Sequence, residues 1–139
     1  MFKGSLVALV TPFDANNRVD FASLKRLIDF HVEQGSNGLV VAGTTGEAAT
    51  LTRSEHAELI AGSVEMSAGR LPIVAGTGSN STEQTIILSR EVGHAGIDAY
   101  LIVVPYYNKP MQEGMYRHFS TVADAVDKWR YMPSCMGLL

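Results

Sequence analysis

The fold of this chain is indicated by the stretch Gly38-Leu39-Val40-Val41-Ala42-Gly43-Thr44-Thr45-Gly46-Glu47. Its first half is a short, continuous apolar run, which is typical of a strand that is buried on both faces. Its second half combines glycines with two hydroxyl side chains, which favours a loop. Thr52 and Glu55 then follow at the spacing of a capping box, so we expect a helix to begin there. The stretch therefore predicts one strand–loop–helix unit.

The same unit recurs along the chain. We expect strands over residues 5–10, 38–42, 72–75 and 99–104, each followed by a helix whose apolar residues lie three and four positions apart. The repeat is about 30 residues, the size of a βα unit. Asp20, Thr52 and Ser81 are expected to cap the first three helices, with Gln84 completing a second capping box. Short connections between alternating strands and helices predict a parallel sheet.

Four such units fit two architectures, an open doubly wound sheet and half of a (β/α)₈ barrel. Secondary-structure propensity does not separate them, but both place their ligands at the carboxyl ends of the strands. The unusual loops of this chain all follow strands, at residues 11–13, 43–47, 76–80 and 105–110. A ligand site is therefore expected at that edge of the sheet.

The last twelve residues interrupt this pattern. A fifth strand is due after Asp127, but residues 128–139 contain no β-branched residue and are too few for another unit. We therefore expect residues 1–127 to form one unit of four strands and four helices, followed by a divergent tail at residues 128–139. The first and fourth strands would then be open edges, so we expect the isolated chain to dimerise or aggregate.

Composition argues against several classes of function. The formal net charge is -3 and no run of Lys or Arg is present, which argues against binding to nucleic acid or to an anionic membrane. The longest apolar run is far shorter than the roughly 20 residues of a membrane span. No signal peptide is expected, because the apolar run at residues 6–10 is too short for one. No internal disulfide is expected, because Cys135 is the single cysteine. These features favour a cytoplasmic protein.

The polar residues of the loops offer several kinds of chemistry. The hydroxyls and main-chain N–H groups of residues 43–47 could hold a carboxylate or a phosphate, although an ordinary glycine turn is an equal alternative. Residues 43–47 are not a Walker A loop, because no Gly-Lys-Ser/Thr follows them. Gly76-Thr77-Gly78 is not a dinucleotide fingerprint, because Ser81 stands where the third glycine is needed. Tyr106 and Tyr107 could donate protons, stack or simply pack. His31 and His118 are expected to be packed or surface residues, and no group has metal-ligand spacing, so we expect no metal and no cofactor.

Taken together, these loops resemble the dihydrodipicolinate synthase family, the 4-hydroxy-tetrahydrodipicolinate synthases. The resemblance covers about residues 3–127 and implies an α/β protein, the N-terminal half, with four β/α units, of a (β/α)₈ TIM barrel. It also implies a lyase of lysine biosynthesis that joins pyruvate to aspartate semialdehyde through a lysine Schiff base. The motifs that carry it are Val10-Thr11-Pro12-Phe13, residues 43–47, Gly76-Thr77-Gly78-Ser79-Asn80 and Pro105-Tyr106-Tyr107-Asn108-Lys109-Pro110.

The resemblance also implies roles for individual residues. Thr45 would hold the pyruvate carboxylate. Thr44 would pass protons in a chain with Tyr107, which reaches across a dimer interface into the neighbouring site, and Tyr106 would pack at the same interface. A homo-oligomer is implied, because family members are often tetramers of tight dimers.

Two parts of the family's pattern have no counterpart in this sequence. These are a relay tyrosine followed by an arginine on the fifth strand, and the Schiff-base lysine in an Ile-Lys-Glu-Ala-like segment of the sixth. Tyr131, Arg130, Lys109 and Lys128 do not stand in the matching motifs. We therefore expect the sequence to end before the imine-forming lysine. The alternatives are an inactive half barrel acting as an assembly partner, another pyruvate-dependent aldolase or lyase, and a four-stranded domain that binds a small carboxylate or phosphate.

Some family members are inhibited by lysine, and the matching cleft would include His56, Asn80 and Tyr106. Arg53 and Gln84 stand where sensitive members tend to have histidine and glutamate. A cationic amino acid would meet an added positive charge and lose a carboxylate partner. Weak or absent sensitivity to lysine is therefore expected.

Overall fold

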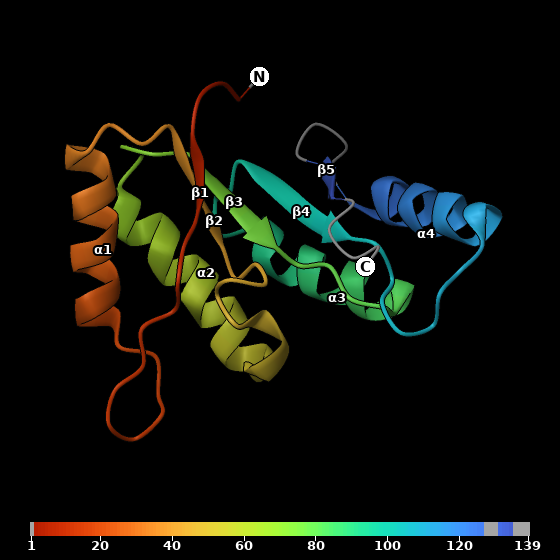
Figure 1. Ribbon diagram of the computed structural model, residues 1–139, viewed down its shortest axis with the longest axis horizontal. Helices are drawn as coiled ribbons and strands as arrows, with labels where there is room; N and C mark the ends of the chain where they lie inside the picture. The colour runs from red at the N-terminus through yellow and green to blue at the C-terminus, as the bar shows by residue number, and fades with distance from the viewer. Residues whose placement is uncertain (1, 127–130, 135–139) are drawn as a thin grey trace.

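The computed structural model describes residues 2–126 and the backbone of residues 131–134 (Figure 1). Strands and helices alternate along the chain, and one short 3₁₀ helix, η1, precedes the second α-helix. Their bounds are β1 Leu6–Ala8, α1 Phe21–Glu33, β2 Gly38–Val41, η1 Ala48–Thr50, α2 Arg53–Ser67, β3 Ile73–Gly76, α3 Thr82–Gly93, β4 Ala99–Val103, α4 Gln112–Ala125 and β5 Tyr131–Ser134. The four predicted β/α units are confirmed.

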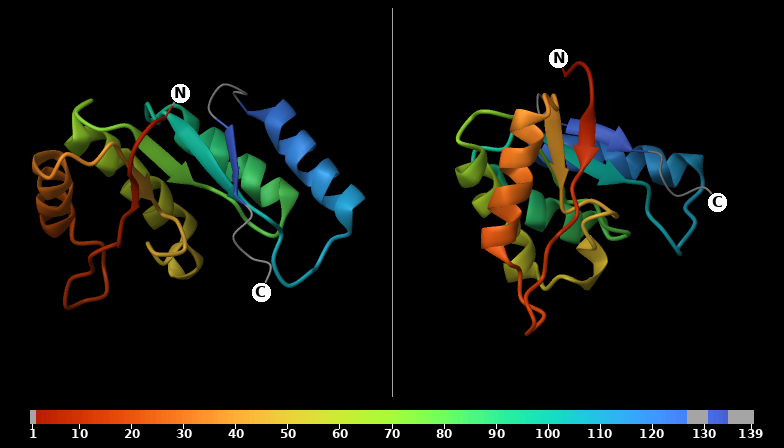
Figure 2. Two further views of the ribbon diagram at one scale, coloured as in Figure 1. Left: turned by 45° about the horizontal axis from the view of Figure 1, so that its top comes forward. Right: turned by 60° about the vertical axis from the view of Figure 1, so that its left-hand side comes forward.

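The strands form one sheet in the order β1-β2-β3-β4-β5, and every neighbouring pair is parallel. Figures 1 and 2 show the four helices lying along one side of this twisted sheet. Each helix therefore carries the chain back, along the same side of the sheet, to the start of the next parallel strand. This is the arrangement expected for right-handed βαβ crossovers. No helix within the described residues is long and apolar enough to span a membrane.

The expectation that the chain has no fifth strand is wrong. Residues Tyr131–Ser134 pair with β4 in parallel register, from Tyr100 opposite Tyr131 to Val103 opposite Ser134. Strand propensity depends strongly on context, and the free hydrogen-bonding edge of β4 offers a template that residue types do not reveal. Pro133 is compatible with this position because an edge strand tolerates a missing N–H. The open edges of the described sheet are therefore β1 and β5, and β4 is an inner strand.

The predicted helix caps are confirmed in two cases and partly confirmed in a third. Asp20 accepts from the N–H of Ser23, and Thr52 forms both halves of its capping box with Glu55. Ser81 accepts from the N–H of Gln84, but its own N–H donates to Ser79 Oγ at 3.2 Å. The serine two residues earlier thus takes the place predicted for the Gln84 side chain.

Side chains alternate between the two faces of the sheet. One set packs against the helices and belongs to the hydrophobic core, namely Val7, Leu39, Val41, Ile73, Ala75, Tyr100 and Ile102. The other set is equally apolar but lies outside that cluster: Val74 and Ala99 are buried, Leu6, Val40, Leu101 and Val103 are partly exposed, and Ala8 is exposed. The strand register places Ala8 beside Val40, Val40 beside Val74 and Val74 beside Ala99. The second set therefore forms one continuous face of the sheet.

The carboxyl ends of β2 and β3 approach each other closely. A Cβ atom added to Gly76 would lie 2.3 Å from the carbonyl oxygen of Ala42, which is a backbone atom and cannot swing away. Ala42 itself has a φ of 54°, so the chain turns sharply as it leaves β2. Glycine at position 76 therefore allows the loops after β2 and β3 to lie side by side.

We predict that Gly76→Ala destabilises the chain by about 1–3 kcal/mol, because the added methyl group forces the two strand ends apart. Gly43→Ala is the matched control, since its Cβ would meet only Val40 Cγ1 at an ordinary 3.5 Å. Urea unfolding followed by circular dichroism measures both free energies. Equal stability of the two variants would contradict the close approach.

Candidate functional site

The loops that follow β2, β3 and β4 meet at the carboxyl edge of the sheet. Three hydrogen bonds connect them to neighbouring segments. Thr11 Oγ1 donates to the carbonyl of Gly46 at 2.7 Å, and Asn108 Nδ2 donates to the carbonyl of Asn80 at 3.2 Å. His56 Nε2 lies 2.7 Å from the carbonyl of Gly76. The edge predicted from the sequence is thus a connected group of loops.

The loop after β2 presents unused hydrogen-bond donors. Its backbone forms two consecutive turns, in which Gly46 N–H donates to the carbonyl of Gly43 and Glu47 N–H donates to that of Thr44. Thr44 and Thr45 are exposed, and within the described residues neither their N–H groups nor their hydroxyls have a hydrogen-bond partner. Two hydroxyls and two N–H groups on adjacent residues are suited to an anionic ligand such as a carboxylate.

Thr11 holds this loop in place, a role that the sequence did not reveal. Its side chain is only 5% exposed, and its hydroxyl bonds the carbonyl of Gly46 across 35 residues of sequence. A Cβ atom on Gly46 would lie 3.1 Å from the carbonyl of Leu9 and 3.2 Å from Thr11 Oγ1. The loop after β2 is therefore packed tightly on the end of β1. A hydroxyl residue directly after a strand was the signal that could have indicated this.

Tyr107 lies at a strained turn after β4. Its φ is 65°, and Asn108 N–H donates to the carbonyl of Tyr106 at 2.9 Å, which closes a three-residue turn around it. A positive φ is unfavourable for a bulky residue and tends to occur where function requires it. The Tyr107 side chain is 90% exposed and that of Tyr106 40%, with their rings edge to face at 5.7 Å. This turn directs Tyr107 away from its own chain.

No hydrogen bond joins Tyr107 to Thr44 within the described part of this chain. The structure thus brings Thr44 and Thr45 together with Thr11, and it brings Asn80 to the loop that carries Tyr106 and Tyr107. The two groups are at the same edge of the sheet but are not in contact through any hydrogen bond described. A role that pairs Thr44 with Tyr107 needs a second chain or a ligand between them.

His56 lies in the first turn of α2 and is only 7% exposed. Burial lowers the pKa of its imidazole below the ordinary value, and the hydrogen bond to the carbonyl of Gly76 opposes this shift to a smaller extent. Its Nε2 therefore carries the proton and anchors α2 to the end of β3. No hydrogen bond connects His56 to Asn80 or Tyr106 among the described residues, although all three come from segments at the carboxyl edge.

His118 is a packed residue, as the sequence indicated. It lies on α4 with 4% exposure, and its Nδ1 is 2.9 Å from Thr82 Oγ1 at the start of α3. Its Nε2 is buried without a hydrogen-bond partner among the described residues. Burial lowers the pKa of this imidazole as well.

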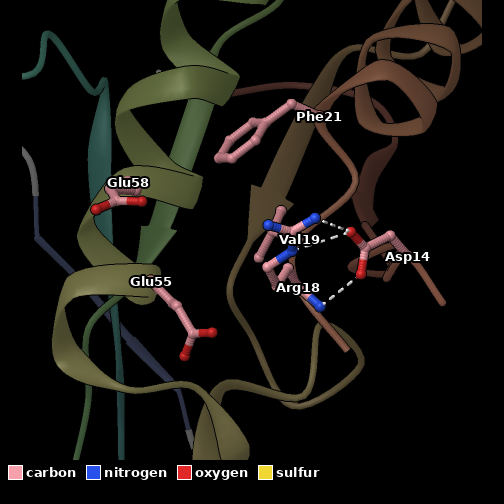
Figure 3. Close-up of a pocket in the computed structure, with 6 residues that line it drawn as sticks. All are labelled: Asp14, Arg18, Val19, Phe21, Glu55 and Glu58. Carbon is pink, nitrogen blue, oxygen red and sulfur yellow. Dashed lines mark hydrogen bonds and ion pairs between the residues drawn. The ribbon is translucent and has the colours of Figure 1, made fainter. Parts of the chain in front are cut away.

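A groove of about 330 Å³ lies between the loop after β1 and the first turns of α2 (Figure 3). Asp14 and Arg18 are joined on one side of it, with Arg18 Nη2 at 3.0 Å from Asp14 Oδ2, while Glu55 and Glu58 come from α2. Hydrogen bonds lower the pKa of Asp14, chiefly one from the N–H of Arg18, and that of Glu55, chiefly one from Thr52. Asp14, Arg18 and Glu55 are therefore already engaged within the chain.

Comparison with known proteins identifies the fold and the loops together. Residues 1–131 match the model of the dihydrodipicolinate synthetase family. The chain belongs to this family. Its loops after β2, β3 and β4 are thus the loops of a dihydrodipicolinate synthetase family member, and the open doubly wound alternative is excluded.

Relatives within the family show how much of it this chain represents. The chain is 55% identical over 127 residues to the 4-hydroxy-tetrahydrodipicolinate synthase of Pseudomonas savastanoi pv. phaseolicola, covering 91% of this chain and 44% of that protein. It superposes with a TM-score of 0.92 on the dihydrodipicolinate synthase from Bacillus anthracis, at 42% identity, covering 96% of this chain and 45% of that one.

A second solved structure is the chloride-inhibited dihydrodipicolinate synthase from Acinetobacter baumannii in complex with pyruvate. It has a TM-score of 0.89 and 47% identity, covering 91% of this chain and 44% of that one. The chain therefore spans less than half the length of the relatives it matches. Its β/α units correspond to the N-terminal half of a (β/α)₈ barrel.

We predict that the chain loses stability as the pH falls below about 6.5, because the unfolded chain takes up protons on His56 and His118 that the folded chain excludes. The stabilisation that comes from the two neutral histidines is fully present above that pH. It is lost as the pH falls toward their lowered pKa values in the folded chain. Urea unfolding between pH 5 and 7.5 measures the slope.

His56→Gln and His118→Gln should each reduce this slope, and the double variant should have the smallest one. Glutamine keeps an N–H donor at a similar position but does not titrate. If His56→Gln retains the full pH dependence, then the buried imidazole does not cause it.

Proposed function

We propose that these residues form the pyruvate-binding half of a 4-hydroxy-tetrahydrodipicolinate synthase, a lyase that condenses pyruvate with aspartate semialdehyde in lysine biosynthesis. The observation that carries the proposal is the pair of exposed threonines after β2, whose N–H and hydroxyl donors are unused. Family membership supports it, as does the similarity to the Acinetobacter baumannii structure with pyruvate.

Thr45 is proposed to bind the pyruvate carboxylate. Its hydroxyl and N–H can both donate to carboxylate oxygens, and bonds to a charged acceptor are stronger than neutral ones. Because Thr11 ties Gly46 to the end of β1, these donors are held at a fixed position before the ligand arrives.

Thr44 and Tyr107 are proposed to carry protons during the reaction. A phenol and a hydroxyl within hydrogen-bond reach can exchange a proton with a reacting group and with each other. Since Tyr107 is directed away from its own chain, we propose that it serves the site of a neighbouring chain in a homo-oligomer. Tyr106, exposed beside it, would then pack in that interface.

The imine-forming amine is proposed to come from a segment outside these residues. The sequence contains four lysines, Lys3, Lys25, Lys109 and Lys128, and none stands in an Ile-Lys-Glu-Ala-like segment. Lys25 pairs with Asp29 on α1, and Lys109 is exposed in the loop after β4. A lysine elsewhere in a complete barrel would condense with the pyruvate ketone and release water to give an iminium ion, which would lose a methyl proton to give the enamine that attacks the aldehyde.

A chimera tests this proposal. Residues 1–126 of this chain would replace the corresponding part of the Acinetobacter baumannii enzyme, and consumption of pyruvate with aspartate semialdehyde would be followed. We predict activity, with Thr45→Val raising the KM for pyruvate by about 10- to 100-fold through loss of one bond to a charged acceptor. Tyr107→Phe should lower kcat by about 100-fold or more, because it removes a proton donor.

Tyr116→Phe and Thr121→Val are the matched controls, since both residues are exposed on α4 away from the three loops. Both should leave kcat and KM within about twofold of the parent chimera. A folded chimera without activity would refute the proposed function. A Thr45→Val variant with unchanged KM would refute the role of that residue.

For regulation, we propose that lysine binds weakly or not at all at the cleft of His56, Asn80 and Tyr106. Arg53 lies one helical turn before His56, and its Nε donates to Glu91 Oε2 at 2.6 Å. The ion pair with Glu91 holds the guanidinium, and Gln84 at the start of α3 offers no negative charge. A cationic ligand therefore lacks a carboxylate partner there.

Calorimetric titration of the chimera with lysine is expected to show no binding tighter than about 1 mM. The double variant Arg53→His with Gln84→Glu should bind more tightly, because it removes a positive charge and adds a negative one. Tight binding by the unmodified chimera would contradict this expectation.

A further inference from the structure

The turn after β4 has an unfavourable backbone conformation on both sides of Asn108. Tyr107 has a φ of 65° and Lys109 a φ of 39°, and neither residue type adopts this region readily. The hydrogen bond from Asn108 N–H to the carbonyl of Tyr106 encloses Tyr107 in a three-residue turn, and the form with a positive φ at its centre is rare and strained. Contacts with other segments therefore have to hold this conformation.

Asn108 supplies such a contact. Its side-chain Nδ2 donates to the carbonyl of Asn80 at 3.2 Å, across 28 residues of sequence. Among the described residues, this is the one hydrogen bond between residues 105–110 and another segment, and the loop itself extends beyond the end of the sheet (Figure 1). The same residue thus closes the turn with its backbone and ties the turn to the loop after β3 with its side chain.

The carbonyl of Asn80 is a firm anchor because the loop that carries it is fixed. Ser79 N–H donates to Thr85 Oγ1 at 3.0 Å, and Thr85 is fully buried on α3. A Cβ atom on Gly78 would lie 2.4 Å from the backbone nitrogen of Val103, so the loop is also packed tightly on the end of β4. A bond to this carbonyl therefore fixes the direction of the turn relative to the sheet.

A second link ties α4 to the same short segment. His118 Nδ1 lies 2.9 Å from Thr82 Oγ1, and Thr82 follows Asn80 by two residues. His118 is only 4% exposed, so this contact is part of the packing between α3 and α4. The path from β4 to α4 is therefore held in its middle by Asn108 and beyond its end by His118.

We propose that Asn108 is a positioning residue for Tyr107, which holds the phenol in the direction that the proposed proton transfer needs. The inference rests on the proposed function, because it takes the Tyr107 hydroxyl as a group that acts in the reaction. In this role Asn108 touches no reacting group and acts through the conformation of the turn. Its partner is a backbone carbonyl, so the side chain at position 80 has no part in it.

Proteolysis of the 139-residue chain tests the fixing of the turn without any turnover. Chymotrypsin cleaves after a tyrosine when the chain around it can open, and the tight turn opposes this at Tyr107. We predict that Asn108→Ala speeds cleavage after Tyr107 by about 10-fold, because the open form of the turn becomes more populated. Each rate is divided by that of a synthetic peptide of residues 103–112 with the same residue at position 108.

Two further variants separate the hydrogen bond from the size of the side chain. Asn108→Asp should speed cleavage as much as Asn108→Ala, since it keeps the shape of the side chain but removes the donor. Asn16→Ala is the matched control, because Asn16 is an exposed asparagine in the loop after β1, and it should leave the rate unchanged. An unchanged normalised rate in Asn108→Ala and Asn108→Asp would overturn the proposal.

A double-variant cycle in the chimera with the Acinetobacter baumannii enzyme tests whether Asn108 acts through Tyr107. Asn108→Ala should lower kcat by about 10- to 100-fold and leave the KM for pyruvate within about twofold, because the turn does not bind the carboxylate. In a Tyr107→Phe background, the same substitution should lower kcat by no more than about twofold, since the hydroxyl that it positions is gone.

The two experiments fail in different ways. Losses that multiply in the double variant would assign Asn108 a general structural role and would overturn the proposal. An inactive chimera would refute the proposed function, whereas faster cleavage of Asn108→Ala in the 139-residue chain would still support the fixing of Tyr107 by Asn108.

Discussion

The structure depends on the parallel alignment of its strands with all of their helices on one side. Alternating side chains on each strand must then face two different environments, a helix layer and an open face. Because the strands run the same way, their carboxyl ends also lie at a single edge. The core and the loops that bear the candidate site both follow from this one arrangement.

The candidate site is held together mostly by side chains that bond backbone carbonyls. Thr11 bonds Gly46, His56 bonds Gly76 and Asn108 bonds Asn80, so each loop is fixed by a residue from another segment. Several non-glycine residues with positive φ also lie in these loops, among them Ala42, Glu47, Tyr107 and Lys109. Strained backbone persists where surrounding contacts determine it, which is the situation at this edge. The loops are thus fixed in shape while the donors of Thr44 and Thr45 remain unused.

Most of the fold could be predicted from the sequence because its signals are local. Apolar runs, caps such as Asp20 and Thr52, and glycine-bearing loops each act over a few residues and agree with one another. The strand at Tyr131–Ser134 was missed because its formation depends on the free edge of β4, which is a long-range property. The Gln84 half of a capping box was predicted but does not form, for a related reason, since Ser79 accepts from the same N–H group. Local patterns give the elements, and the competition between partners is visible only in three dimensions.

The candidate site was likewise predictable where its signals are local and not where they depend on long-range contacts. The loop sequences indicated where ligand chemistry lies, but not that Thr11 fixes the loop after β2 or that Tyr107 is turned away from its own chain. The proposed reaction needs two further parts that the described residues of one chain do not supply, an imine-forming amine and, for Tyr107, a neighbouring site. The donors of Thr44 and Thr45 alone would bind a carboxylate without converting it. The segment that supplies the amine is therefore the feature that separates catalysis from simple binding in the proposed function.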